Sequence, residues 1–166
     1  MMINLEEKIL VLTTGGTLDK VYFDAKSEFE VGDSIVGQML LQSEVNRPFE
    51  LSELLRKDSL ELTDADRESI RHAVVESACK RIIITHGTDT MTVTAAALTG
   101  IEDKVIVMTG ALAPARFART DAMFNLGMAF GAVQVLPAGV YIAMNGCIFD
   151  AARVKKDLSR NVFVST

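Results

Sequence analysis

The sequence is poor in the residues that hold many small secreted or metal-bound domains together. Its 166 residues contain no Trp, three Pro and two Cys. Cys79 and Cys147 form no CxxC or Cys/His spacing, so we interpret both as small buried hydrophobic residues and not as a disulfide or a metal site. His72 and His86 are the only histidines, and no spacing of Asp, Glu and His indicates a metal.

Positive charge is also in short supply. The chain has 17 Lys and Arg against 22 Asp and Glu, which gives a net charge of −5. A nucleic-acid partner is therefore not expected, because phosphate contacts need a basic surface. Apolar residues make up 49% of the chain, which excludes intrinsic disorder. At about 150 residues per domain, the length predicts a single domain over residues 1–166.

The sequence also lacks a leader and an uninterrupted hydrophobic span. Its first residues show no basic segment followed by an apolar stretch, so we expect no signal peptide. Residues 126–144 carry Gln134 as their only strongly polar side chain, which approaches the length of about 20 residues that a membrane span needs. Pro137 and Gly139 interrupt this stretch, so a helix followed by a buried strand explains it better. We expect a soluble, cytoplasmic protein without membrane contact.

Four short apolar runs are present, and each ends in small polar residues and glycine. They lie at residues 9–12, 82–84, 105–108 and 140–144. Continuous apolar runs of this length are typical of strands that are buried on both faces. A weaker, alternating run at residues 49–51 resembles an edge strand.

Helical patterns separate these runs. Residues 63–66 resemble a capping box and begin a helix with Ile70, Ala73, Val74 and Ala78 on one face. Residues 92–98 and 121–134 predict two further helices, and residues 34–42 a short amphipathic one. In the helix at 121–134, near-helical spacing marks a face with Phe124, Met128, Ala132 and Val135.

Strands that alternate with helices predict an α/β fold of three layers, with a doubly wound, mostly parallel sheet, helices on both faces and right-handed βαβ crossovers. In such sheets the ligand crevice lies beyond the carboxyl ends of the strands. The polar, glycine-containing endings of all four apolar runs fall at that edge. The candidate site is therefore predicted there from topology alone.

Two of these endings carry reactive side chains. Residues 14–17 (TGGT) form a glycine turn that could bind an anion, but GxxxxGK[ST] and GxGxxG are absent, and on this motif alone a plain tight turn is the favoured interpretation. Residues 86–90 (HGTDT) place two hydroxyls, a carboxylate and an imidazole directly after a strand. This cluster is better explained by chemistry than by helix capping, whereas His86 by itself is typical of a hydrogen-bonded structural histidine.

A basic segment follows the fourth apolar run. Lys155 and Lys156 belong to it, and most such pairs are solvated surface, which is our interpretation of Lys155. A lysine beside a carboxylate in a partly desolvated crevice can accept a proton, because burial lowers the pKa of its ammonium group. Thr, Lys and Asp together can then act as nucleophile, base and orienting group.

Taken together, these segments resemble the bacterial-type L-asparaginase family, including its glutaminase-asparaginase members. Residues 14–18 (TGGTL) and 84–91 (ITHGTDTM) carry most of the resemblance. Residues 107–111 (VMTGA) and 153–156 (RVKK) follow in the family's order. The HGTDTM string is highly specific and the TGGT string moderately so.

The resemblance implies an amidohydrolase that works through a threonine acyl-enzyme, without metal or other cofactor. Thr17 matches the family's nucleophile, and Tyr22 the tyrosine that activates it from a mobile loop. Thr88, Asp89 and Lys156 match the family's Thr-Lys-Asp group. The implied substrate is a small amide such as L-asparagine, which releases ammonia.

The resemblance also implies how the substrate is held. Ser59, next to Asp58, matches the serine that binds the substrate's α-carboxylate, and Asp89 would also meet its α-ammonium group. Backbone N–H groups of the glycine turns, at Gly16 and Gly87, are suitable donors to the oxyanion, each typically contributing about 3–4 kcal/mol.

The chain departs from the family pattern in length. Family members are about twice as long and carry a second α/β domain, so we expect residues 1–166 to be the N-terminal domain without the usual C-terminal one. The segment from Thr17 to Tyr22 is also shorter than in many members, which predicts a reduced lid.

Three hypotheses follow. The first is a single-domain amidohydrolase that forms a homodimer or larger homo-oligomer, so that a second copy covers the crevice. The second is a catalytically weak or inactive module that binds a small amino acid in the same pocket. The third is a structural remnant without a ligand. Retention of Thr17, Thr88, Asp89 and Lys156 together counts against the third.

Overall fold

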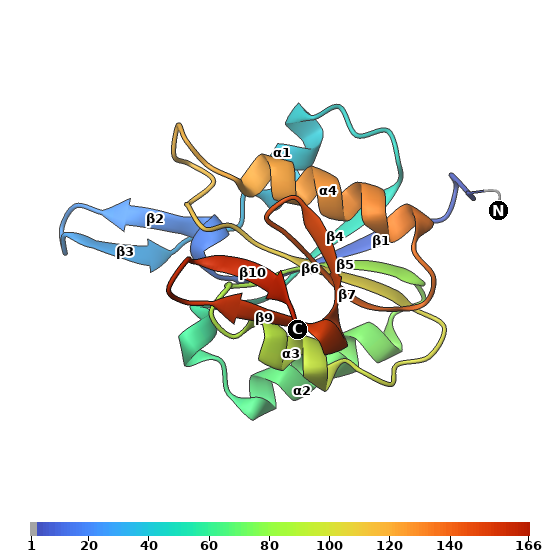
Figure 1. Ribbon diagram of the computed structural model, residues 1–166. Coiled ribbons are helices and arrows are strands. Elements are labelled where there is room, and N and C mark those ends of the chain that lie inside the picture. The colour runs from blue at the N-terminus through green and yellow to red at the C-terminus, as the bar shows by residue number, and fades with distance from the viewer. Residues whose placement is uncertain (1–2) are drawn as a thin grey trace.

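A six-stranded sheet forms the centre of the computed structural model, which describes residues 3–166 (Figure 1). The strand order is β4-β1-β5-β6-β7-β8, and all neighbours are parallel except β7 and β8. The strands are β1 (Ile9–Gly15), β4 (Phe49–Lys57), β5 (Arg81–Thr85), β6 (Val105–Thr109), β7 (Gly139–Met144) and β8 (Cys147–Asp150). The predicted edge strand at 49–51 is thus present, and it is longer than its apolar run.

Helices cover both faces of the sheet, which confirms the predicted α/β fold (Figure 1). One face packs against α1 (Val36–Gln42) and α4 (Ala122–Val135), and the other against α2 (Asp64–Glu76) and α3 (Met91–Ala97). Successive residues of each central strand alternate between the two cores, as Val11 and Leu12 do in β1. The continuous apolar runs follow from this two-sided burial.

The α4 crossover corrects the expectation that every crossover is right-handed. The β5–α3–β6 and β6–α4–β7 connections step in the same direction across the sheet, yet α3 and α4 lie on opposite faces. These two crossover connections therefore have opposite handedness. The connection through α1 reverses both direction and face, and the connection through α2 keeps both, so each shares the hand of the α3 crossover. Apolar periodicity reports how much of a helix is buried, and carries no information about which face of the sheet the helix covers.

Two hairpins outside the main sheet are not predicted by the hydrophobic pattern. The first pairs β2 (Lys20–Phe23) with β3 (Glu28–Val31) and projects from the molecule (Figure 1). The second pairs β9 (Val154–Asp157) with β10 (Val162–Ser165), and its Val154 and Phe163 enter the core on the α2 and α3 face. Three short 3-10 helices complete the described chain: η1 (Thr17–Asp19), η2 (Ser59–Glu61) and η3 (Ala151–Arg153).

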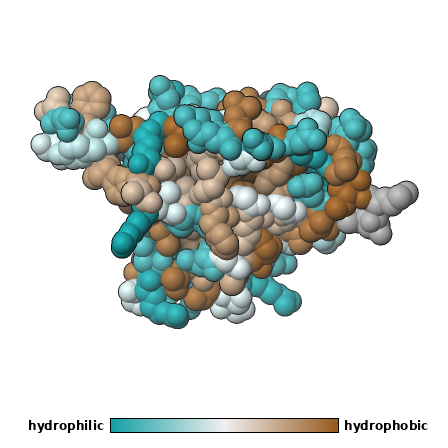
Figure 2. All heavy atoms as spheres, turned by 90° about the horizontal axis from the view of Figure 1, so that it is seen from above, coloured by the Kyte–Doolittle hydropathy of each residue, from teal (hydrophilic) through white to brown (hydrophobic). Residues whose placement is uncertain are grey.

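The predicted helices are present, and the face expected for α4 is right only in part. Ala132 is buried and Met128 packs against the same core, whereas Phe124 and Val135 are 66% and 51% exposed. Apolar residues surround this helix on all sides, so spacing alone did not identify its buried face. Figure 2 views the molecule from this side, where hydrophobic side chains reach the surface.

Three smaller expectations have mixed outcomes. The capping box of α2 is present, with reciprocal bonds between Thr63 and Asp66, but the helix ends before Ala78. Cys147 is exposed and Cys79 partly exposed, so the interpretation of both as buried is wrong. Residues 126–144 divide into the end of α4 and β7, as predicted, and no helix among residues 3–166 is long and apolar enough to cross a membrane.

Candidate active site

The candidate site lies where β1 and β5 run side by side. From β1 the chain crosses to β4 on one side, and from β5 it continues to β6 on the other. The carboxyl ends of two such strands flank the crevice at which open α/β sheets bind ligands. Thr17 follows β1 and Thr88 follows β5, so both candidate threonines come from this point.

Gly16 and Gly87 bring the two loops into direct backbone contact. Gly16 has φ +85°, and a Cβ built there would lie 2.4 Å from the backbone nitrogen of Gly87. A Cβ on Gly87 would in turn lie 2.6 Å from the Cβ of Ser59. Only glycine fits positions this close, so the two motifs and η2 pack together through their backbones. Thr17 follows Gly16 and Thr88 follows Gly87, so the backbones of the two threonines lie close to each other.

Lys156 reaches this junction from the distant β9–β10 hairpin. Its Nζ donates hydrogen bonds to Thr88 Oγ1 at 2.8 Å and to Asp89 Oδ1 at 2.6 Å. The Lys156 side chain is only 8% exposed, so water screens these contacts weakly. The three residues predicted to act together are therefore adjacent, although 67 positions separate Lys156 from Asp89.

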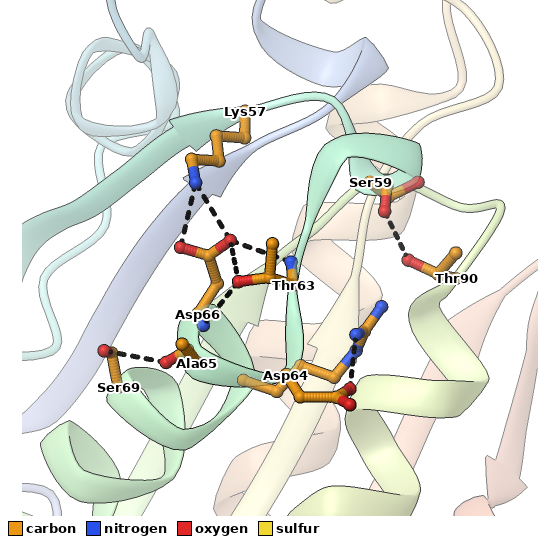
Figure 3. Close-up of polar contacts among 9 residues, drawn as sticks. Lys57, Ser59, Thr63, Asp64, Ala65, Asp66, Ser69 and Thr90 are labelled. Atoms are coloured by element: carbon orange, nitrogen blue, oxygen red, sulfur yellow. Dashed lines mark hydrogen bonds and ion pairs between the residues drawn. The ribbon is translucent and has the colours of Figure 1, made fainter.

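Asp58 and Ser59 lie beside the same junction. Ser59 is 2% exposed, and its carbonyl oxygen accepts a hydrogen bond from Thr90 Oγ1 at 2.7 Å (Figure 3). Asp58 accepts from the backbone nitrogen of Leu60 and forms an ion pair with Lys20 at 2.7 Å. Burial by itself raises the pKa of Asp58, but these two contacts outweigh it and the pKa is lowered. Asp58 therefore carries a negative charge near neutral pH.

A polar network fixes the approach of β4 to this loop. Lys57 Nζ donates to both oxygens of Asp66, which also accepts from the backbone and hydroxyl of Thr63 (Figure 3). The Thr63 backbone N–H and Lys57 lower the pKa of Asp66 to about 2. Because Lys57 immediately precedes Asp58, this network holds the segment that carries Ser59 against the start of α2.

Tyr22 lies in the projecting β2–β3 hairpin. Its ring contacts Phe29 edge to face at 5.2 Å between centroids, and Phe29 contacts Phe117 at 5.7 Å. The Tyr22 side chain is exposed, and the hairpin extends away from the sheet (Figure 1). In this conformation Tyr22 packs within its own hairpin and not at the Gly16–Gly87 junction.

His86 is a structural residue, as interpreted from the sequence. It is fully buried, with Nδ1 2.7 Å from the Gly87 carbonyl oxygen and Nε2 2.8 Å from Thr94 Oγ1. A carbonyl only accepts, so Nδ1 carries the proton and Nε2 accepts from the Thr94 hydroxyl. Burial lowers the pKa of His86 to about 4, which keeps the ring neutral. The imidazole thus orients Gly87 without exchanging protons.

Asp19 is a candidate that the sequence pattern did not reveal. It lies two residues beyond Thr17, is 1% exposed, and has a pKa that burial raises to about 6. The available signal was a carboxylate in the TGGTLD string, next to a predicted buried strand. In residues 3–166 no three His, Cys, Asp or Glu side chains are grouped so that they could hold a metal ion.

Comparison with known proteins gives a consistent result. The family model described as "Asparaginase, N-terminal" matches residues 8–164. The L-asparaginase of Thermococcus kodakarensis is 31% identical over 95% of this chain and 51% of its own length, and L-asparaginase 2 of Escherichia coli is 31% identical over 93% and 47%. The chain therefore spans about half the length of these curated relatives.

Solved structures agree with these sequence matches. The thermostable L-asparaginase from Thermococcus kodakarensis superposes with a TM-score of 0.80 at 29% identity, over 95% of this chain and 51% of that one. L-asparaginase I from Vibrio cholerae gives 0.81 at 27% identity, over 96% and 51%. The likeness covers nearly all of this chain and half of each neighbour.

Proposed function

This chain belongs to the asparaginase family, as its N-terminal domain, and from that premise we propose that it is an asparaginase-type amidohydrolase. The proposed reaction converts the side-chain amide of L-asparagine, or of a similar small amide, to a carboxylate and ammonia. We also propose that residues 1–166 form one domain. The match of the family model to residues 8–164 supports this boundary.

The observation that carries the proposal is the double hydrogen bond of Lys156. One largely buried ammonium group contacts both a hydroxyl and a carboxylate, at 2.8 and 2.6 Å. A structural lysine can also have two partners, as Lys104 does. What supports a proton relay at Lys156 is the kind of partner: it joins a hydroxyl beside the Gly16–Gly87 junction to a carboxylate that can orient it. In the proposed mechanism Asp89 orients Lys156, and Lys156 exchanges a proton with the Thr88 hydroxyl.

The proposed reaction has two steps. First, the Thr17 hydroxyl oxygen bonds to the amide carbon while a base takes its proton. The carbon–nitrogen bond then breaks, the base gives that proton to the departing nitrogen, and ammonia leaves. Second, a water adds to the resulting ester, the bond to Thr17 breaks, and its hydroxyl regains a proton. A threonine hydroxyl is a weak nucleophile without a base. The proposed proton acceptors are Lys156 in its neutral amine form, reached through the Thr88 hydroxyl, and Tyr22 after movement of its hairpin.

Charge that develops on the carbonyl oxygen needs donors at the same place. The Gly16 N–H, expected from the sequence to serve here, donates instead to the Lys57 carbonyl oxygen at 2.9 Å, so the proposed oxyanion donor is the backbone N–H of Gly87. Ser59 is the proposed contact of the substrate's α-carboxylate, with Asp58 beside it as a further substrate-binding residue and Asp89 at the substrate's α-ammonium group. The 42% exposure of the Asp89 side chain leaves room for that second contact.

We further propose that the chain associates with a second copy of itself. The exposed side of α4 supports this proposal, because none of the residues from Ala122 to Val135 is charged. Phe124 and Met123 are exposed on that side, and Met123 lines an apolar groove of about 440 Å³ between α1 and α4. In a chain of net charge −5, a neutral face matches the same neutral face of another copy without charge repulsion.

Ammonia release from small amino-acid amides tests the proposed activity directly. Purified chain is expected to release ammonia from L-asparagine, and Thr17→Ala to abolish it, because no other group would form the ester. Thr17→Ser keeps a hydroxyl and serves as the matched control, with partial activity expected.

Thermal-shift measurements on the same amides separate the alternatives. Stabilisation by an amide without ammonia release would contradict the enzyme and favour the amino-acid-binding module. Full activity of Thr17→Ala would remove Thr17 from the mechanism.

A further inference from the structure

Asp19 is a buried carboxyl group that the proposed reaction does not use. Its Oδ1 accepts a hydrogen bond from the backbone nitrogen of Ile35 at 3.1 Å, just before α1 begins. Its Oδ2 is buried and has no hydrogen-bond partner among residues 3–166. A buried carboxylate oxygen without a donor lowers stability. Stability alone therefore does not account for a carboxyl at this position.

The main chain of Asp19 closes the foot of the β2–β3 hairpin. The Gly32 nitrogen donates to the Asp19 carbonyl oxygen at 2.9 Å, and Arg116 Nη1 donates to the same oxygen at 3.4 Å. Arg116 Nη2 also donates to the Asp33 carbonyl oxygen at 3.0 Å. One guanidinium group therefore joins the two ends of the hairpin.

The same loop also contacts the hairpin further out. Phe117, which follows Arg116, packs against Phe29, and Phe29 packs against Tyr22. A continuous series of contacts therefore connects the loop that carries Arg116 to Tyr22. Asp19 is also close to the candidate nucleophile, because Thr17 lies only two residues before it in the same short helix, η1.

The groups around the Asp19 carboxyl act in opposite directions on its charge. Burial is the largest effect and raises the pKa, while the Ile35 N–H, Ser34 and Arg116 lower it and Glu53 of β4 raises it further. The resulting pKa is about 6. Lys20, the next residue, is paired with Asp58 and does not neutralise Asp19.

We propose that Asp19 is a positioning residue whose charge holds the foot of the β2–β3 hairpin and so sets where Tyr22 lies relative to Thr17. When ionised, the carboxylate attracts Arg116 and strengthens the contacts that close the foot. When protonated, it loses that attraction and the hairpin becomes more mobile. The proposed role of Asp19 in holding the hairpin is argued from these contacts, whereas its consequence for catalysis rests on the proposed function.

Tyrosine fluorescence gives a direct test, because the chain has no Trp and only two Tyr. Tyr141→Phe leaves Tyr22 as the single emitter. Acrylamide quenching of this variant is expected to increase as the pH falls from 8 to 5, with a midpoint near 6. Hydrogen exchange of residues 20–31, corrected for intrinsic rates, is expected to increase over the same range.

Asp19→Asn in the same background keeps the shape of the side chain and removes its charge. We expect high quenching at every pH and no midpoint, with circular dichroism unchanged. His72→Gln, on α2 across the sheet, is the matched control and keeps the midpoint. A midpoint that persists in Asp19→Asn, or its absence from the Asp19 protein, would overturn the proposal.

Ammonia release separates this proposal from the proposed function. If the chain hydrolyses amides, kcat is expected to fall as the pH drops through about 6, and Asp19→Asn is expected to remove that dependence. If no amide is hydrolysed, the fluorescence result still decides the role of Asp19.

Discussion

Lys155 and Lys156 are consecutive residues in quite different surroundings. The Lys155 side chain is exposed on β9, whereas that of Lys156 is largely buried against Thr88 and Asp89. Alternation along a strand explains the difference, because neighbouring side chains point to opposite faces. The chain therefore contains its own matched pair of lysines for testing a catalytic role.

Lys156→Met is expected to reduce the rate of amide hydrolysis by about 10²- to 10⁴-fold, the range typical of a lost proton-transfer group. Lys155→Met is expected to stay within about twofold, as most surface substitutions do. Steady-state ammonia release measures both, with circular dichroism as the check on folding. Equal rates for the two variants would show that Lys156 takes no part in the reaction.

At the scale of the element, the β9–β10 hairpin connects core packing to the site. Lys156 is paired in register with Phe163, which is buried and whose backbone nitrogen donates to Asn145 Oδ1 at 2.8 Å. The same hairpin thus inserts an aromatic ring into the core and holds an ammonium group at the junction. Loss of the packing of Phe163 should therefore displace the ammonium group of Lys156.

Phe163→Ala is expected to lower the free energy of unfolding by about 3–5 kcal/mol, as for other buried aromatic residues, and to reduce activity with it. Phe163→Leu fills more of the space and is expected to cost under about 1.5 kcal/mol. Urea unfolding measures both, and Leu158→Ala, at an exposed position of the same hairpin, is the control. A Phe163→Ala protein as stable as the control would show that this ring does not anchor the hairpin.

At the scale of the whole molecule, the helices on the two faces of the sheet differ in the charge of their outer sides. The outer side of α2 carries several charged residues, while α4 carries none. An uncharged helix on the outside of an acidic protein is typical of a surface that a partner covers. A second copy is the partner proposed above.

Sedimentation over a range of concentrations is expected to show a dimer or larger assembly. Phe124→Glu places a charge on the outer side of α4 and is expected to shift the protein toward monomer, because the glutamate would be buried without a partner. Val75→Glu, at an exposed position of α2, is the control and should leave the assembly unchanged. A monomer at every concentration would contradict self-association.

Local pattern predicted much of this protein. Continuous apolar runs identified the four central strands, because burial on both faces leaves its mark in the side chains themselves. Glycine-containing strand endings and the TGGT and HGTDTM strings located the candidate site and indicated the family. The position of Thr17 and Thr88 at one edge followed from the parallel order of the strands.

Tertiary structure alone decided the rest. The contact of Lys156 with Asp89 depends on a hairpin whose short strands show no clear period, and on packing between residues far apart in the chain. The hand of the α4 crossover and its outer side depend on which face of the sheet the helix covers. Asp19 accepts hydrogen bonds from Arg116 and Ile35, which belong to two other segments. Each of these is a long-range contact, and local sequence carries no direct record of such contacts.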